Sequence, residues 1–117
     1  MYKSNVIEMG SLVESFKEEM LVILFGPEAP KELREVSVIH DCVQISENPV
    51  QEGGLLIIDN QEYSITAVGS SANQNLKELG HISIYFNEIE GDILPGAVFV
   101  SPSSMPIIKE GSTIIFK

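Results

Sequence analysis

The chain distributes its hydrophobic residues in short runs, and turn-forming residues separate these runs. Closely spaced runs of this kind, rich in valine and isoleucine, are typical of the strands of a sandwich or barrel. Between two of them, Asp59-Asn60-Gln61 predicts a hairpin turn. The runs are Met20–Phe25, Val36–Ile45, Leu55–Ile58, Tyr63–Val68, Ile82–Phe86, Ala97–Val100 and Ile114–Phe116.

Helical patterns are fewer and shorter than the strand-like runs. Asn73–Leu79 predicts a helix that ends at Gly80, and Ser11–Glu19 carries apolar residues at helical spacing. One further turn is expected over 31–35, after Pro30. Long parallel β–α–β crossovers have no room in such a chain. The pattern therefore predicts a mainly β fold: residues 1–117 form a single domain, a small, largely antiparallel closed or nearly closed barrel with one or two short helices.

Charge and apolar run length limit the partners of this domain. Seventeen acidic residues against seven lysines and arginines give a net charge of −10, which disfavours nucleic acid and anionic membrane surfaces as partners. The longest apolar run, Met20–Phe25, has six residues, whereas a transmembrane helix needs about twenty. Cys42 is the only cysteine, so an intrachain disulfide is excluded. Together with an N-terminus unlike a signal peptide, this predicts a cytoplasmic protein.

Sequence motifs for cofactors and metals are missing. The chain has no glycine-rich phosphate-binding loop, no dinucleotide-binding fingerprint, no zinc-protease motif and no paired cysteines. The nucleophile elbow of the α/β-hydrolases is absent as well. We therefore expect no cofactor and no metal, which leaves the ordinary side chains as candidates for any chemistry.

The two histidines, His40 and His81, are the candidates for that chemistry. Histidine changes charge near neutral pH, and it is a nucleophile that can carry a covalent adduct. Because side chains alternate along a strand, His40 shares a partly apolar face with Val38 and Cys42. His81 shares a polar face with Ser83, so we expect His81 to be the more exposed of the two. Either ring is also compatible with an ordinary hydrogen-bonded or solvated histidine.

A strand-to-helix turn over 68–72 offers a second candidate feature. Its two serines, Ser70 and Ser71, stand where a predicted strand ends and a helix begins. Free N–H groups at a helix start attract anions, and the two hydroxyls add hydrogen-bond donors. Plain capping of the helix explains the same serines.

Longer strings resemble a known family over essentially the whole chain. The most specific string joins Ile65-Thr66-Ala67-Val68-Gly69-Ser70 to Asn75-Leu76-Lys77-Glu78-Leu79-Gly80-His81. Met20-Leu21-Val22-Ile23 and Phe25 ahead of Ala29-Pro30, and the turn Leu94-Pro95-Gly96, match as well. In these strings the chain is similar to the glucitol/sorbitol-specific IIA component of the bacterial phosphotransferase system.

The resemblance implies a phosphotransferase component that works as a phosphoryl carrier. In that family a histidine accepts a phosphoryl group from the histidine phosphocarrier protein, and the component passes it to the IIB part of the membrane sugar permease. The acceptor follows an aliphatic pair after the Ala-Pro turn, which corresponds here to His40. Asp41 and Cys42 depart from the family pattern, so the resemblance implies no role for them.

Joined to the residue pattern, the resemblance predicts a layout for the site. We expect His40 at the barrel surface in a shallow apolar dish, where neighbouring aliphatic side chains shield the phosphorylated ring from water. Ser70 and Ser71 then bind the phosphoryl oxygens, and His81 has a supporting role as a hydrogen-bond donor.

Two other functions stay open at the level of sequence. A non-catalytic β-barrel module of the same family would regulate or scaffold a partner without carrying phosphate. A sugar-binding barrel has less support, because the chain has no tryptophan and only eight aromatic residues.

Overall fold

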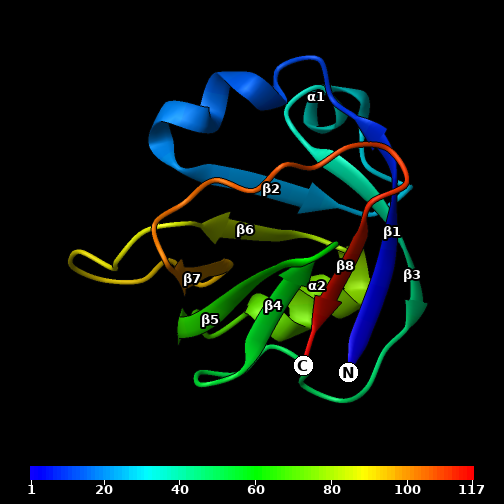
Figure 1. The fold of residues 1–117 in the computed structure, drawn as a ribbon. Helices are drawn as coiled ribbons and strands as arrows, with labels where there is room; N and C mark the ends of the chain where they lie inside the picture. Colours follow the sequence, from blue (N-terminus) through cyan, green and yellow to red (C-terminus); the bar gives the residue numbers. More distant parts are fainter.

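Eight strands form a closed barrel in the computed structural model, which describes residues 1–117 (Figure 1). Around the barrel they follow the order β1-β3-β2-β6-β7-β5-β4-β8. The predicted mainly β, closed barrel is confirmed. The strands are β1 (Tyr2–Met9), β2 (Leu21–Phe25), β3 (Val38–Gln44), β4 (Leu55–Ile58), β5 (Gln61–Val68), β6 (Ile82–Tyr85), β7 (Ala97–Ser101) and β8 (Thr113–Phe116).

Most neighbouring strands are antiparallel, as predicted, and two pairs are parallel. The β2–β3 and β6–β7 pairs run in the same direction. These two parallel pairs agree with the prediction that long β–α–β crossovers are absent, because the connections 26–37 and 86–96 are short. The β4–β5 hairpin turns at the predicted place, where Asp59 adopts a φ of 54°.

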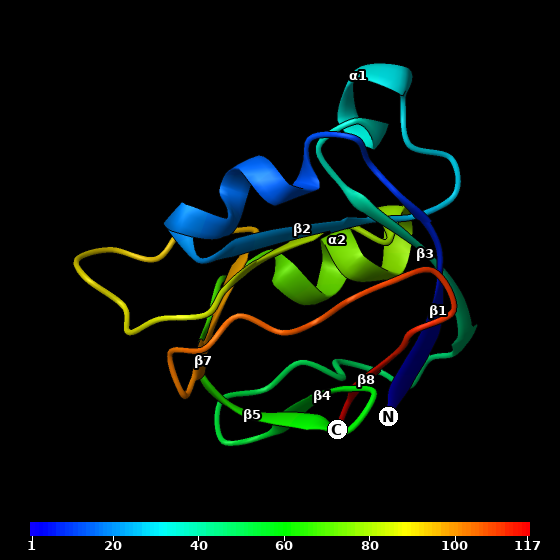
Figure 2. The ribbon, with the colours of Figure 1, turned by 45° about the horizontal axis from the view of Figure 1, so that its top comes forward.

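Three short helices accompany the barrel, against the one or two expected. The 3-10 helix η1 (Val13–Glu19) and the single turn α1 (Lys31–Arg34) occupy connections between strands. The third, α2 (Ala72–Leu79), buries Ala72 and Leu76 in the core of the barrel. In Figure 2, α2 lies between β2 and the β4–β5 hairpin, so it covers the interior of the barrel there.

The first strand is the element that no apolar run predicts. Its side chains alternate strictly between buried and exposed over the first six positions, but the buried ones, Tyr2, Ser4 and Val6, include a serine. A polar residue at an inward position interrupts the apolar pattern on which strand prediction depends. This serine is 0% exposed, and it forms part of the candidate site.

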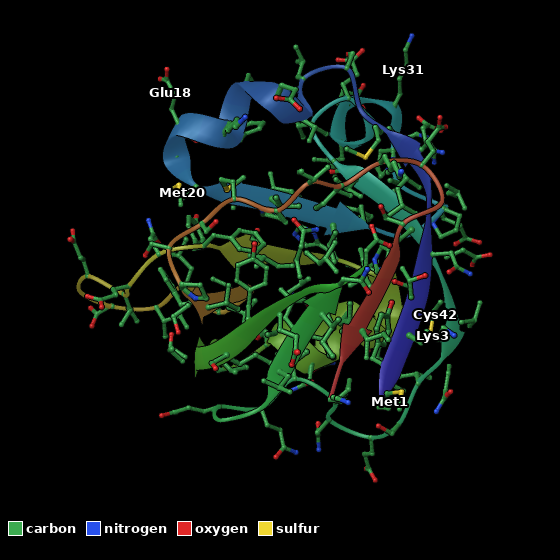
Figure 3. All side chains as sticks on the ribbon, viewed as in Figure 1. Met1, Lys3, Glu18, Met20, Lys31 and Cys42 are labelled. Atoms are coloured by element: carbon green, nitrogen blue, oxygen red, sulfur yellow. The ribbon has the colours of Figure 1, made fainter.

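The outer surface carries the acidic and basic side chains. Figure 3 shows Glu18 of η1 and Lys31 of α1 pointing away from the barrel, and both residues are exposed. Cys42, also exposed, lies near Lys3 of β1 in the same view. None of the helices combines the length and the apolar character that crossing a membrane requires.

Candidate functional site

His40 lies on the inward face of β3, opposite β1. Val6 is its cross-strand partner, and Ser4 lies one diagonal step along β1, opposite Cys42. Diagonal neighbours on the same face of an antiparallel pair are within reach of long side chains. The ring is only 1% exposed, so the expected position in a shallow dish at the barrel surface is wrong. The reason is long-range: the C-terminal end of α2 covers the ring, and nothing near His40 in the sequence indicates this.

Both ring nitrogens of His40 are hydrogen-bonded. The Nε2 atom lies 2.6 Å from the backbone carbonyl oxygen of Gly80, and Nδ1 lies 2.7 Å from Oγ of Ser4. A carbonyl oxygen only accepts hydrogen bonds, so Nε2 carries the proton and donates it. The Nδ1 atom of the neutral ring then accepts a hydrogen bond from the Ser4 hydroxyl. Two neighbours therefore determine the tautomer of His40.

A cleft of about 570 Å³ reaches the buried ring from the surface. His40 and Gly80 line this cleft, whereas Ser4 does not. The hydrogen-bond partner of Nε2 therefore belongs to the cleft lining, and the partner of Nδ1 does not. Leu79, next to Gly80 in the cleft wall, is 50% exposed, so the cleft is open to solvent.

The cleft combines an apolar wall with a charged rim. Its apolar side chains are Tyr2, Phe25, Pro27, Pro30, Leu76 and Leu79. Three acids, Glu28, Asp41 and Glu78, and one lysine, Lys77, are exposed at its rim. The rim therefore carries a net negative charge, in line with the −10 of the whole chain. Cys42 also lines the cleft.

The surroundings of His40 lower its pKa below the ordinary value of 6.5. Burial is the main cause, because the charged ring loses its contact with water; the hydrogen bond to Gly80 and the charge of Asp41 act in the opposite direction. The ring is therefore held neutral in the folded protein at neutral pH. A neutral imidazole keeps one lone pair, which a nucleophile requires.

This shift predicts a pH-dependent stability. Below about pH 6.5 the unfolded chain binds a proton at His40 that the folded protein resists, so the free energy of unfolding falls as the pH is lowered from there to the folded pKa. Denaturant unfolding from about pH 7.5 to about pH 5 should show this loss in the wild type and a smaller loss in His40→Gln. Parallel pH curves for the two proteins would contradict the assignment.

His81 occupies a different environment on the same side of the barrel. It is partly exposed, and thus the wetter histidine, as expected. Its ring stacks on Phe25 with centroids 4.6 Å apart, and its Nδ1 lies 3.1 Å from the carbonyl oxygen of Leu24. Since Phe25 lines the cleft, His81 supports the cleft wall from behind.

Ser70 and Ser71 lie away from His40. They precede α2, while Gly80, which contacts His40, follows it. An eight-residue helix such as α2 is about 12 Å long, so the two serines and the His40 ring are at opposite ends of it. Neither serine lines the cleft. The predicted meeting of the serine pair with a phosphoryl group on His40 is therefore corrected: α2 keeps them apart.

Ser4 and Gly80 are the site residues that sequence reasoning missed. Gly80 is identifiable as a helix end, but the contact of its carbonyl with a ring forty residues away is not. Ser4 lies on a strand with no apolar run. Its inward position follows only from the alternation with Tyr2 and Val6, which was the one available signal.

A family model decides the relationship. The model described as "PTS system glucitol/sorbitol-specific IIA component" matches residues 1–115. The chain belongs to this family. The predicted membership, based on the sequence strings, is thereby confirmed, and the family implies a phosphotransferase role.

Individual relatives agree with the family match. This IIA-family chain is 32% identical over 117 residues to the "PTS system glucitol/sorbitol-specific EIIA component" of Escherichia coli (strain K12), covering 99% of this chain and 94% of that protein. It is 29% identical over 116 residues, with the same coverage, to the protein of that description from Shigella flexneri. A crystal structure of a PTS system IIA component from Enterococcus faecalis V583 superposes with a TM-score of 0.86 at 31% identity, covering 97% of this chain and 98% of that one.

Proposed function

We propose that residues 1–117 act as one IIA-type phosphoryl-carrier domain of a glucitol/sorbitol phosphotransferase system. His40 accepts a phosphoryl group from the histidine phosphocarrier protein and passes it to the IIB part of the sugar permease. One observation carries the proposal. His40, the histidine that the family resemblance indicates, is held neutral in the lining of an open cleft, and Gly80, the partner of its Nε2, lines the same cleft.

The transfer uses Nε2, the nitrogen whose hydrogen-bond partner lines the cleft. The resting Nε2 carries a proton, so the ring first changes tautomer: Nε2 loses its proton and Nδ1 gains one. The P–N bond of the donor's phosphohistidine then breaks, its electron pair stays on the donor nitrogen, and a new P–N bond forms with the lone pair of His40 Nε2. Such a transfer passes through a loose, in-line transition state, so positioning contributes most of the catalysis. In the resting protein Nε2 donates to Gly80. Docking of a partner therefore has to separate Nε2 from this carbonyl.

The cleft supports a protein partner better than a small molecule. Its apolar side chains provide a surface that a protein can cover, and its acidic rim favours a partner with a positively charged rim of its own. His81, by stacking on Phe25, has its supporting role in holding one wall of that surface rather than in contacting phosphate.

Phosphoryl acceptance in vitro tests this function. The purified chain is incubated with phosphoenolpyruvate and the general phosphotransferase proteins, and the phosphorylated residue is mapped by mass spectrometry under alkaline conditions that preserve phosphohistidine. The expected result is one acid-labile phosphoryl group, on His40, that a IIB protein removes. A chain that takes up no phosphoryl group under conditions in which the phosphocarrier protein is phosphorylated would favour the non-catalytic barrel module instead.

A further inference from the structure

Ser4 contacts the nitrogen of His40 that the reaction does not use. We propose, on the basis of the function above, that Ser4 is a positioning residue whose hydroxyl holds Nδ1 of His40 in both protonation states of that nitrogen and so presents Nε2 for phosphoryl transfer. The direct support is the 2.7 Å contact between Ser4 Oγ and His40 Nδ1, a hydrogen bond between two buried side chains.

The strand geometry places this hydroxyl against the His40 ring. Ser4 is 0% exposed, and the β1–β3 register shifts between Lys3 and Ser4, at an irregularity next to the contact. Such irregularities redirect side chains and recur next to active sites. The neighbouring inward residues of β1, Tyr2 and Val6, belong to the hydrophobic core. An alanine would therefore fill the inward position without the cost of burying a hydroxyl.

The hydrogen bonding of Ser4 differs from that of the other two buried serines. Ser112 uses its hydroxyl within a turn, where it donates to Asp59 and accepts from the backbone N–H of Lys109. Ser37 is also 0% exposed, and its hydroxyl has no hydrogen-bond partner at all. Ser4 differs from both, since its partner is a titratable ring from another strand.

A hydroxyl suits the proton balance of the reaction because it both donates and accepts. In the resting ring Nε2–H donates to Gly80, and the Ser4 hydroxyl donates to Nδ1. Once docking has freed the ring from Gly80, cleft water can reach it: Nε2 releases its proton to this water and Nδ1 takes one from it, so the proton count of the ring is unchanged. The Ser4 oxygen then accepts from Nδ1–H. Without Ser4, that buried N–H has no partner in the state that attacks, which disfavours this state.

Three variants test the proposal. Ser4→Ala removes the hydroxyl, Ser4→Thr retains it, and Ser37→Ala is the matched control, a buried serine whose hydroxyl has no partner. We expect Ser4→Ala to slow phosphoryl transfer on the order of 10- to 100-fold, the change that leaving one buried N–H without a partner produces. Ser4→Thr should restore most of the rate, and Ser37→Ala should transfer at the wild-type rate. Thermal unfolding of each variant verifies that it is folded.

A spectroscopic readout distinguishes positioning from a structural role. In ¹⁵N-labelled phosphorylated protein, the Nδ1–H proton of His40 should be protected from exchange in the wild type and in Ser4→Thr, and exposed to exchange in Ser4→Ala. Transfer by Ser4→Ala at the wild-type rate, or a phosphoryl group on Nδ1, would overturn the role of Ser4 while leaving the carrier function intact. A wild-type chain that accepts no phosphoryl group would overturn both, and the variants are not needed to see it.

Discussion

His40→Gln will accept no measurable phosphoryl group, whereas the matched variant His81→Gln will be phosphorylated. Glutamine keeps a polar side chain beside Ser4 and Gly80, so the barrel should remain folded, but it has no nucleophilic nitrogen. His81 lies on the other side of Phe25 and outside the cleft lining, so its loss disturbs a wall and leaves the acceptor in place. We expect a complete loss for the first variant and about a tenfold slower transfer at most for the second.

Measuring both the amount of label and its stability in acid makes this prediction decisive. Radioactive phosphoenolpyruvate reports uptake, and acid treatment separates phosphohistidine from phosphoserine. An acid-labile label that persists in His40→Gln or His40→Ala would remove His40 from the role of acceptor. An acid-stable label would indicate phosphoserine instead, and serines such as Ser70 and Ser71 would then be the candidates for the acceptor.

The fold could be predicted largely from local patterns. The turn residues that end each short apolar run lie close to the ends of the observed strands. Gly80 ends α2, as its position after Leu79 predicts. The two sides of β6 also follow from alternation, with Ile82 and Ile84 buried and Ser83 and Tyr85 partly exposed. What local patterns miss is β1, since its inward serine is meaningful only in contact with a strand about forty residues away.

The site required information that local patterns do not contain. Alternation places His40 on a face with Val38, and both are buried. It does not reveal that the C-terminal end of α2 lies over that face, because this contact joins residues 40 and 80. The same long-range packing explains the error over the serines. Ser70 and Ser71 precede α2, whereas His40 contacts Gly80 after its last turn, and nothing in the sequence shows which end of α2 meets β3.

Gly80→Ala will cause a large loss of stability. Gly80 has a φ of 67°, and a Cβ there would lie 2.8 Å from both N and Cα of Gly26. Backbone cannot move aside as a flexible side chain does, so strain and steric clash add. We expect a loss of roughly 3 kcal/mol or more in the free energy of unfolding, measured by denaturant titration. Gly91→Ala is the matched control: its φ is 77°, but nothing lies within 4 Å of the added Cβ. It should lose about 1 kcal/mol.

The same substitution also tests whether Gly80 holds the acceptor closed. The added Cβ would lie 3.4 Å from His40 Nε2, so relief of the clash with Gly26 has to displace the carbonyl that Nε2 contacts. If transfer requires this contact to open in a controlled way, Gly80→Ala should alter the transfer rate even at temperatures where it is fully folded, and Gly91→Ala should not. Wild-type transfer by folded Gly80→Ala would show that the carbonyl is a packing partner of the ring and has no part in exposing it. Equal destabilisation of the two variants would mean that the backbone around Gly26 and Gly80 relaxes without cost. It would contradict the inference that these two cleft-lining glycines are closely packed.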